Sequence, residues 1–295
     1  MGSVYAAILG DAGNEVWALD TWAEHVDAIR KHGLTVEGAS GHRTVRVHAT
    51  DDPAGIGVCD LVVIATKARD VEAAARSAVP LVGAETVVLP IQNGLGSADR
   101  VASVLGDEAV AIGVAEGFGA SLVGPGHVRH AGWERVRLGE RHGPATPRIH
   151  RIASVWADAG FRVQAYDDVD RLVWEKLICN VCFSGTCAIM ERTIGEVLRD
   201  PYAWQVASAC AAEAYAVARA RGVGIEVDDP VSYARAFGER IPDARPSLLL
   251  DVLAGRPTEI DVINGAISPA AREVGLAAPV NDVVSALVRA KGPAG

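Results

Sequence analysis

Short hydrophobic runs alternate with helical patterns through the first half of the chain. The runs are rich in β-branched residues, and one contains the unbroken apolar stretch Leu61-Val62-Val63-Ile64. Continuous runs of this kind are typical of strands in a parallel sheet that is covered on both faces. The alternation predicts βαβ units. We predict strands at 15–20, 60–66 and 86–92, and helices at 22–32, 70–79 and 97–105.

The pattern changes near residue 166. Before it, further strands are predicted within 34–47 and 109–138, followed by a helix at 146–159 and a short strand at 161–165. After it, apolar residues recur only at helical spacing. The sequence therefore predicts an α/β domain over residues 1–166 and an all-helical domain over residues 167–295. The predicted helices of the second domain lie at 172–190, 193–198, 202–221, 229–237, 247–253, 260–274 and 281–290.

Composition narrows the class of protein. Hydrophobic residues make up 49% and charged residues 22% of the chain, which is typical of a globular enzyme. The formal net charge of −9 argues against a nucleic-acid partner, which would require a basic surface. No run approaches eighteen uninterrupted apolar residues, and the N-terminus lacks the basic segment of a secretory signal. We therefore expect a cytoplasmic protein without a membrane partner, and the five cysteines indicate reduced core thiols rather than a metal site.

The N-terminus has the spacing of a dinucleotide-binding motif that is cut short. Gly2 opens a helix-like run, and Asp20 ends the next predicted strand. In such a motif the third glycine starts the helix, and an acidic residue about 20 positions later holds the ribose hydroxyls. The first strand and the first two glycines would then lie before Met1. The alternative is an ordinary helix, with Asp20 as a surface carboxylate.

Two explanations account for the missing strand: a protein that lacks its phosphate loop, or a start assigned too late, within a motif of the form G-x-G-x-M-G. We favour the second. A helix packed on a sheet without its central strand would leave a large apolar groove uncovered, which the hydrophobic effect penalises.

Two predicted strands end in polar residues that suit a ligand cleft. Asn93 and Gly94 follow the strand at 86–92, and Lys67 follows the strand at 60–66. Ligands of open α/β sheets bind at the carboxyl ends of strands, so Lys67 is a candidate for a cofactor phosphate or ribose. The alternatives are a helix cap for Asn93 and a solvated lysine for Lys67.

Lys176 lies on the first helix of the second domain, with Asn180 and Ser184 at intervals of four residues. The three side chains therefore share one helix face. A polar stripe on an apolar helix predicts a cleft, and desolvation lowers the pKa of a lysine so that it can act as a general acid. The alternative is that Lys176 extends to solvent. Lysine is rare here, with four among 28 basic residues, and all eight histidines lie within residues 25–150.

Taken in order, these motifs resemble the ketopantoate reductase (2-dehydropantoate 2-reductase) family. The resemblance covers nearly the whole chain and rests on the ordered set rather than on any one motif. The motifs are Met1-Gly2, Lys67, Asn93-Gly94, Trp174-x-Lys176-Leu177 with Asn180, and Thr258-Glu259-Ile260-Asp261 with Asn264-Gly265. Without the resemblance, Thr258 and Asp261 would be read as helix-start signals.

The resemblance implies an N-terminal Rossmann domain, an all-helical C-terminal domain, and reduction of a branched 2-keto acid by NADPH or NADH. It implies that Lys176 polarises and protonates the keto oxygen. Glu259 would hold substrate hydroxyl groups, and Asn93 would lie beside Lys176 and the nicotinamide. Asn180 and Ser247 would bind substrate.

Two departures from the family pattern keep alternatives open. Ser184 replaces the usual asparagine of the second substrate-binding position, which allows another 2-keto acid or an imine as substrate. No arginine adjoins Asp20, which favours NADH, although Arg30 and Lys31 follow on the next helix. A non-catalytic descendant that lost its phosphate loop is a third hypothesis. The sequence leaves a homodimer open.

Overall fold

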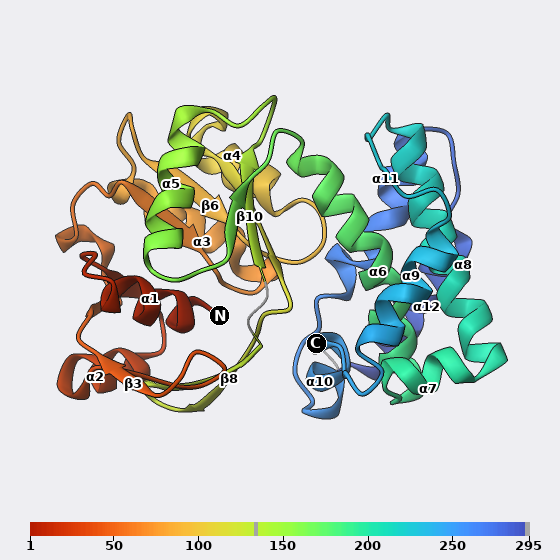
Figure 1. The fold of residues 1–295 in the computed structure, drawn as a ribbon, viewed down its shortest axis with the longest axis horizontal. Helices are drawn as coiled ribbons and strands as arrows, with labels where there is room; N and C mark the ends of the chain where they lie inside the picture. The colour runs from red at the N-terminus through yellow and green to blue at the C-terminus, as the bar shows by residue number, and fades with distance from the viewer. Residues whose placement is uncertain (133–134, 293–295) are drawn as a thin grey trace. The chain divides into compact units, whose positions relative to one another are not determined.

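The computed structural model describes residues 1–132 and 135–292, which form two compact units (Figure 1). Unit 1 comprises Met1–Gln92 and Ser97–Val169. Unit 2 comprises the short segment Asn93–Gly96 and the chain from Asp170 onward. Residues 133 and 134, within the strand region predicted at 109–138, lie outside the described residues.

Unit 1 contains parallel strands joined through helices. Strands β1 (Trp17–Leu19) and β4 (His48–Thr50) pair in parallel, as do β5 (Leu61–Ile64) and β6 (Val87–Pro90). A bridge from Val88 to Val110 leads from β6 toward β7 (Ala111–Glu116). Strand β7 pairs antiparallel with β10 (Arg135–Glu140), and β10 pairs in parallel with β11 (Val163–Ala165). This α/β arrangement is of the Rossmann type expected from the sequence.

A second sheet of unit 1 has the order β3-β2-β9-β8. Its strands are β2 (Leu34–Gly38), β3 (Arg43–Val45), β8 (Gly119–Gly124) and β9 (His127–Gly132).

Among the described residues, no strand pairing joins β1 to β5. Strands β1 and β5 belong to separate two-stranded sheets. All three residues of β1 and the first three of β5 are only partly buried, whereas every residue of β6 is buried. Partial burial is unusual for parallel strands, which are normally covered on both faces.

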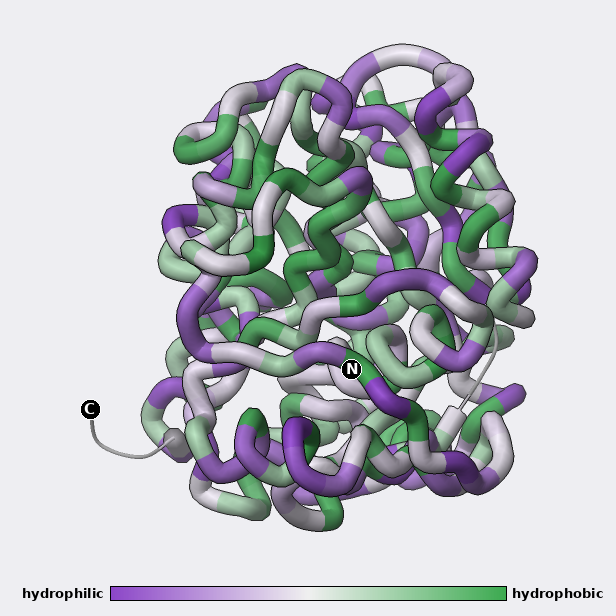
Figure 2. Tube along the Cα trace, turned by 90° about the vertical axis from the view of Figure 1, so that its left-hand side faces the viewer, coloured by the Kyte–Doolittle hydropathy of each residue, from purple (hydrophilic) through white to green (hydrophobic). Residues whose placement is uncertain are grey.

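The helices of unit 1 are α1 (Gly2–Asp11), α2 (Ala23–His32), α3 (Val71–Ala78), α4 (Ser97–Leu105) and α5 (Pro147–Asp158). They follow the predicted ranges within two residues. Helix α1 packs against aromatic side chains. The centroid of the Tyr5 ring lies 5.1 Å from that of Trp156 and 6.0 Å from that of Phe161. Hydrophobic segments run mainly through the interior, and hydrophilic ones lie mainly at the periphery (Figure 2).

Unit 2 consists of helices and short 3₁₀ turns. Helix α6 (Val169–Met190) has the length and hydropathy of a membrane span, but 72% of its apolar window is buried within the protein. Core helices of soluble proteins share these properties, so α6 is no indication of a membrane protein. The other helices are α7 (Ile194–Arg199), α8 (Pro201–Ala220), α9 (Pro230–Arg240), α10 (Ser247–Leu253), α11 (Ile267–Glu273) and α12 (Pro279–Lys291).

The single helix predicted at 260–274 is wrong. The segment forms two 3₁₀ turns, η5 (Ile260–Val262) and η6 (Asn264–Ala266), and α11 begins only at Ile267. Ile263, between the turns, has φ −104° and ψ −101°, outside the helical region. The Val262 carbonyl accepts a hydrogen bond from the Leu95 N–H, 2.9 Å away, rather than from a helix donor. A contact distant in sequence therefore interrupts the helical pattern.

Candidate active site

Helix α6 carries the predicted polar stripe. Lys176 and Asn180 are half-buried, and Ser184 is 6% exposed. The intervening residues Leu177 and Val181 are almost fully buried, because the rest of the helix surface packs in the core of unit 2. Helical spacing places the three polar side chains on one face. The three residues thus lie on one helix, and the cleft that they were taken to indicate stays a prediction.

A buried amide network braces the middle of α6. Asn264 Nδ2 donates to the Val181 carbonyl at 2.8 Å and to Asn281 Oδ1 at 2.9 Å. Asn281 Nδ2 in turn donates to the Cys210 carbonyl and to Glu213 Oε2, at 3.1 and 2.8 Å. The anchored carbonyl lies between the positions of Asn180 and Ser184. The sequence analysis gave Asn264 no role, although an asparagine after Val262-Ile263 in an apolar run was a signal of a buried amide.

The loop Asn93–Gly96 lies against the segment that carries Glu259. Glu259 is half-buried at the start of η5, and its carbonyl accepts from the Val262 N–H at 3.2 Å. The Val262 carbonyl accepts from Leu95, two residues beyond Asn93. The structure therefore joins the backbone segments of Asn93 and Glu259, which are more than 160 positions apart.

Ser247 is the first residue of α10 and is exposed. Within the described part of the chain, its side chain makes no hydrogen bond. The contacts of unit 2 thus bring together the Asn93 and Glu259 segments, and separately align the α6 stripe. They do not link Ser247 to either group.

Three of the residues predicted for the cofactor, Gly2, Asp20 and Lys67, belong to unit 1, whereas Asn93 groups with unit 2. Gly2 begins α1, whose N-terminus is capped by no side chain of the described residues and has no acidic residue in its first turn. Burial lowers the pKa of the Met1 amino group, and the charge of Lys67 lowers this pKa further, which places Lys67 near the start of α1. An uncapped helix N-terminus beside a cation fits the pyrophosphate of a dinucleotide.

Asp20 follows β1 and lies beside the end of β4. Its N–H donates to the Thr50 carbonyl at 3.1 Å, and its exposed carboxylate accepts from the Trp22 N–H at 2.9 Å. Among the described residues Asp20 makes no ion pair. A carboxylate in this position fits ribose hydroxyls and repels a 2′-phosphate.

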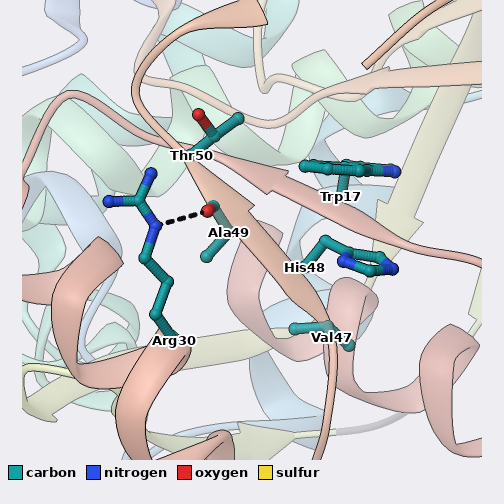
Figure 3. Close-up of a pocket in the computed structure, with 6 residues that line it drawn as sticks. All are labelled: Trp17, Arg30, Val47, His48, Ala49 and Thr50. Carbon is teal, nitrogen blue, oxygen red and sulfur yellow. Dashed lines mark hydrogen bonds between the residues drawn. The ribbon is translucent and has the colours of Figure 1, made fainter. Parts of the chain in front are cut away.

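Arg30, which could otherwise pair with a 2′-phosphate, already interacts with other residues of unit 1. Its guanidinium lies 3.5 Å from Asp27 and 3.6 Å from Asp51, and it donates to the Ala49 carbonyl at 2.9 Å. Figure 3 shows Arg30 reaching β4 from α2, in a pocket of about 400 Å³ that is also lined by Trp17 and His48. No predicted site residue lines this pocket.

The comparisons with known proteins cover both units. Residues 1–143 match the model described as "Ketopantoate reductase PanE/ApbA", and residues 168–292 match "Ketopantoate reductase PanE/ApbA C terminal". This chain belongs to the ketopantoate reductase family. A 2-dehydropantoate 2-reductase of Archaeoglobus fulgidus is 31% identical over 98% of this chain and 94% of its own length. The resemblance inferred from the motifs is thus confirmed.

Solved structures share the fold of this chain. The PanE/ApbA family ketopantoate reductase from Ralstonia eutropha JMP134 has a TM-score of 0.88 and 33% identity, covering 97% of this chain and 93% of its own. A D-mandelate dehydrogenase, solved with NADH and anilino(oxo)acetate, has a TM-score of 0.89 and 27% identity, covering 99% and 95%. The solved structures similar to this chain thus include a ketopantoate reductase and a D-mandelate dehydrogenase.

The buried cysteine thiols of this chain have no role in the proposed chemistry. Cys179 and Cys182 are buried thiols outside any disulfide, and burial raises the pKa of Cys182 well above its ordinary value. A protonated buried thiol is a poor nucleophile and a poor metal ligand. Among residues 1–132 and 135–292, no three histidine, cysteine or acidic side chains form a metal-binding cluster.

Proposed function

We propose that this chain reduces a branched 2-keto acid, ketopantoate to pantoate, with hydride supplied by NADPH or NADH. The observation that carries the proposal is the polar stripe Lys176, Asn180 and Ser184 on an otherwise buried helix. The same unit holds the Asn93 loop against the Glu259 segment. Family membership supports this reaction class, because the Archaeoglobus fulgidus relative is named a 2-dehydropantoate 2-reductase.

Lys176 is proposed as the general acid. Hydride addition to the carbonyl carbon leaves an alkoxide oxygen that requires a proton, and a positioned ammonium group can donate it. Unit 2 contains no histidine in its sequence, since all eight histidines lie within residues 25–150 and outside the segment Asn93–Gly96. Lys176 is half-buried on α6.

The other residues have binding and orienting roles in this proposal. Glu259 holds substrate hydroxyl groups, and Asn93 lies beside the keto group and the nicotinamide. Asn180, Ser184 and Ser247 bind substrate. Gly2 and Lys67 bind the cofactor pyrophosphate, and Asp20 binds the adenosine ribose.

The test is Lys176→Ala, assayed by oxidation of NADH and NADPH with ketopantoate. Loss of a general acid typically costs about 10² to 10⁴ in rate, so kcat should fall by that factor. Cofactor affinity, measured by nucleotide fluorescence, should stay within about two-fold of the original value, because Lys176 donates its proton only to the substrate. Arg151→Ala, which removes an exposed cation from α5 of unit 1, is the control. Wild-type kcat in Lys176→Ala would contradict the mechanism.

A second candidate is reduction of a different 2-keto acid or of an imine. Ser184 motivates it, because a short hydroxyl stands where the family resemblance implies an asparagine, and it is 6% exposed. The similarity to a D-mandelate dehydrogenase supports an aromatic 2-keto acid within this class. A panel of branched, aromatic and short 2-keto acids, with imines included, separates the two candidates by kcat/KM. If no nucleotide binds at all, the chain is instead the non-catalytic descendant.

A further inference from the structure

Within unit 2, the loop that carries Asn93 approaches the Val262 backbone more closely than a side chain would allow. Gly94 has φ +84°, a left-handed conformation that favours glycine. A Cβ atom at this position would lie 2.0 Å from the Val262 carbonyl oxygen and 2.6 Å from its carbon. Both are backbone atoms, so no flexible side chain can move aside. Alanine at position 94 would therefore have to separate the two backbones.

The contact is also hydrogen-bonded and buried. Leu95 donates its N–H to the same Val262 carbonyl at 2.9 Å, and Val262 is 5% exposed. Val262 ends the 3₁₀ turn η5, which starts beside Glu259. Asp261, within this turn, forms an ion pair with α12, because its carboxylate lies 2.6 Å from the Arg289 guanidinium. The surface that receives Gly94 is thus held by the helices of unit 2.

On its other side the loop is anchored to the sheet of unit 1. The Gln92 side chain donates to the carbonyls of Ile64, at 2.7 Å, and Thr66, at 3.2 Å, at the end of β5. Between Met1 and Val169, the four residues Asn93–Gly96 are the ones that group with unit 2, and the chain returns to unit 1 at Ser97. Asn93 is therefore fixed by the docking of Gly94 and Leu95 on Val262.

We propose that Gly94 is a positioning residue, which holds Asn93 in register with the Glu259 segment by allowing direct backbone contact with Val262. This inference rests on the proposed function for the roles of Asn93 and Glu259. Gly94 itself touches neither substrate nor cofactor in the proposal. It acts by allowing an approach that any larger residue prevents.

Gly96 provides a matched control within the same loop. It has φ +87°, nearly the same as Gly94, but nothing lies within 4 Å of a Cβ built on it. Alanine imposes the same left-handed strain at both positions and meets the Val262 backbone at only one. The difference between Gly94→Ala and Gly96→Ala therefore isolates the close approach.

The experiment measures kcat, cofactor affinity and amide exchange for the two variants. A displacement near 1 Å can cost about 100-fold in rate, so we expect Gly94→Ala to lose about that factor in kcat while its affinity for the cofactor stays within about two-fold. Gly96→Ala should keep kcat within about three-fold of the original, because only backbone strain is added. Equal kcat for the two variants would overturn the proposal.

Hydrogen exchange of the Leu95 amide tests the contact with Val262 directly, even in a variant that has no measurable turnover. In the unmodified protein this amide should be protected, and Gly94→Ala should remove that protection while Gly96→Ala retains it. Free exchange of Leu95 in the unmodified protein would overturn the docking even if Gly94→Ala fails to fold. Absence of turnover with every 2-keto acid, together with a protected Leu95, would instead overturn the proposed function alone.

Discussion

At the scale of single residues, Glu140 and Arg148 form an ion pair with a buried carboxylate outside the candidate site. The Glu140 side chain is 5% exposed and that of Arg148 is 28% exposed. Arg148 donates to both carboxylate oxygens, from Nε at 2.9 Å and from a terminal nitrogen at 2.5 Å. Thr146 adds a third hydrogen bond to Glu140. A buried carboxylate with this set of donors is stable only as long as its partners remain.

We predict that Arg148→Ala destabilises the protein in a pH-dependent way. Burial raises the pKa of Glu140, but the hydrogen bonds from Arg148 and Thr146 outweigh burial and leave this pKa below its ordinary value. A lowered carboxyl pKa stabilises the fold above the unfolded pKa, about 4.3, and the effect is lost as pH falls through the folded value. Removing Arg148 should cost about 3 kcal/mol near neutral pH.

Urea unfolding at neutral pH and below pH 4 measures this effect. The difference between the unmodified protein and Arg148→Ala should narrow in acid, as Glu140 becomes protonated in both. Arg76→Ala is the control, since its ion pair with Glu72 is exposed and should contribute less than about 1 kcal/mol at either pH. A difference that is the same at both pH values would contradict the assignment.

The candidate site shows which residues a sequence can indicate. Lys176 was predicted because lysine is rare in this chain and because Asn180 and Ser184 follow it on the same helix face, and its role stays a prediction. Asn264 could not be assigned, because its role depends on Val181 and Asn281, and folding alone brings those residues near it. Periodicity predicts which face a residue occupies, but not its partner on another helix.

At the scale of elements, the N-terminus of α12 depends on a side chain from α8. Glu213 accepts the N–H groups of Val280 and Asn281 at 2.9 and 3.0 Å. It also accepts from the Asn281 side chain, which is fully buried and bonded to Asn264. One carboxylate therefore caps a helix and supports the amide network that braces α6.

We predict that Glu213→Ala destabilises the protein by about 2 kcal/mol, because it removes a helix cap and leaves the buried Asn281 amide short of an acceptor. Thermal unfolding measures the loss. Glu273→Ala, which breaks an exposed ion pair with Arg221, is the control and should leave the unfolding temperature nearly unchanged. An equal shift for the two variants would show that the network contributes no more than a surface ion pair.

Elements with a clear local pattern were predicted accurately, and those with distant partners were not. Helices α4 (Ser97–Leu105) and α10 (Ser247–Leu253) coincide with their predicted ranges. The predicted helix at 260–274 was wrong because the Val262 carbonyl pairs with Leu95, about 170 positions earlier. Local apolar spacing carries no information about such a pairing.

At the scale of the whole molecule, the predicted chemistry divides between the units. The cofactor residues Gly2, Asp20 and Lys67 belong to unit 1. The proposed catalytic and substrate residues belong to unit 2, and Asn93 joins them although it follows a strand of unit 1. The sequence predicted the two domains from the change in hydrophobic period. It did not predict that four loop residues would group with the second unit, because only the tertiary contact with Val262 makes them do so.

This division yields a prediction about cofactor choice that is independent of turnover. Asp20 has an exposed carboxylate without an ion-pair partner among the described residues, and Arg30 is engaged by Asp27 and Asp51. A 2′-phosphate beside Asp20 would meet the negative charge of that carboxylate. We therefore expect NADH to bind at least about ten-fold more tightly than NADPH, a difference of about 1.4 kcal/mol.

Asp20→Asn tests the origin of that preference. Removing the charge should lower the ratio of NADPH to NADH dissociation constants several-fold, mainly through tighter binding of NADPH, because the repulsion acts only on the 2′-phosphate. Raising the salt concentration should lower the ratio in the unmodified protein for the same reason. Asp158 is an exposed carboxylate at the end of α5. Asp158→Asn therefore changes the net charge of the protein by the same amount as Asp20→Asn, and it should leave the ratio unaltered. If Asp20→Asn and Asp158→Asn change the ratio equally, the selection arises from the overall charge of the protein rather than from the residue that ends β1.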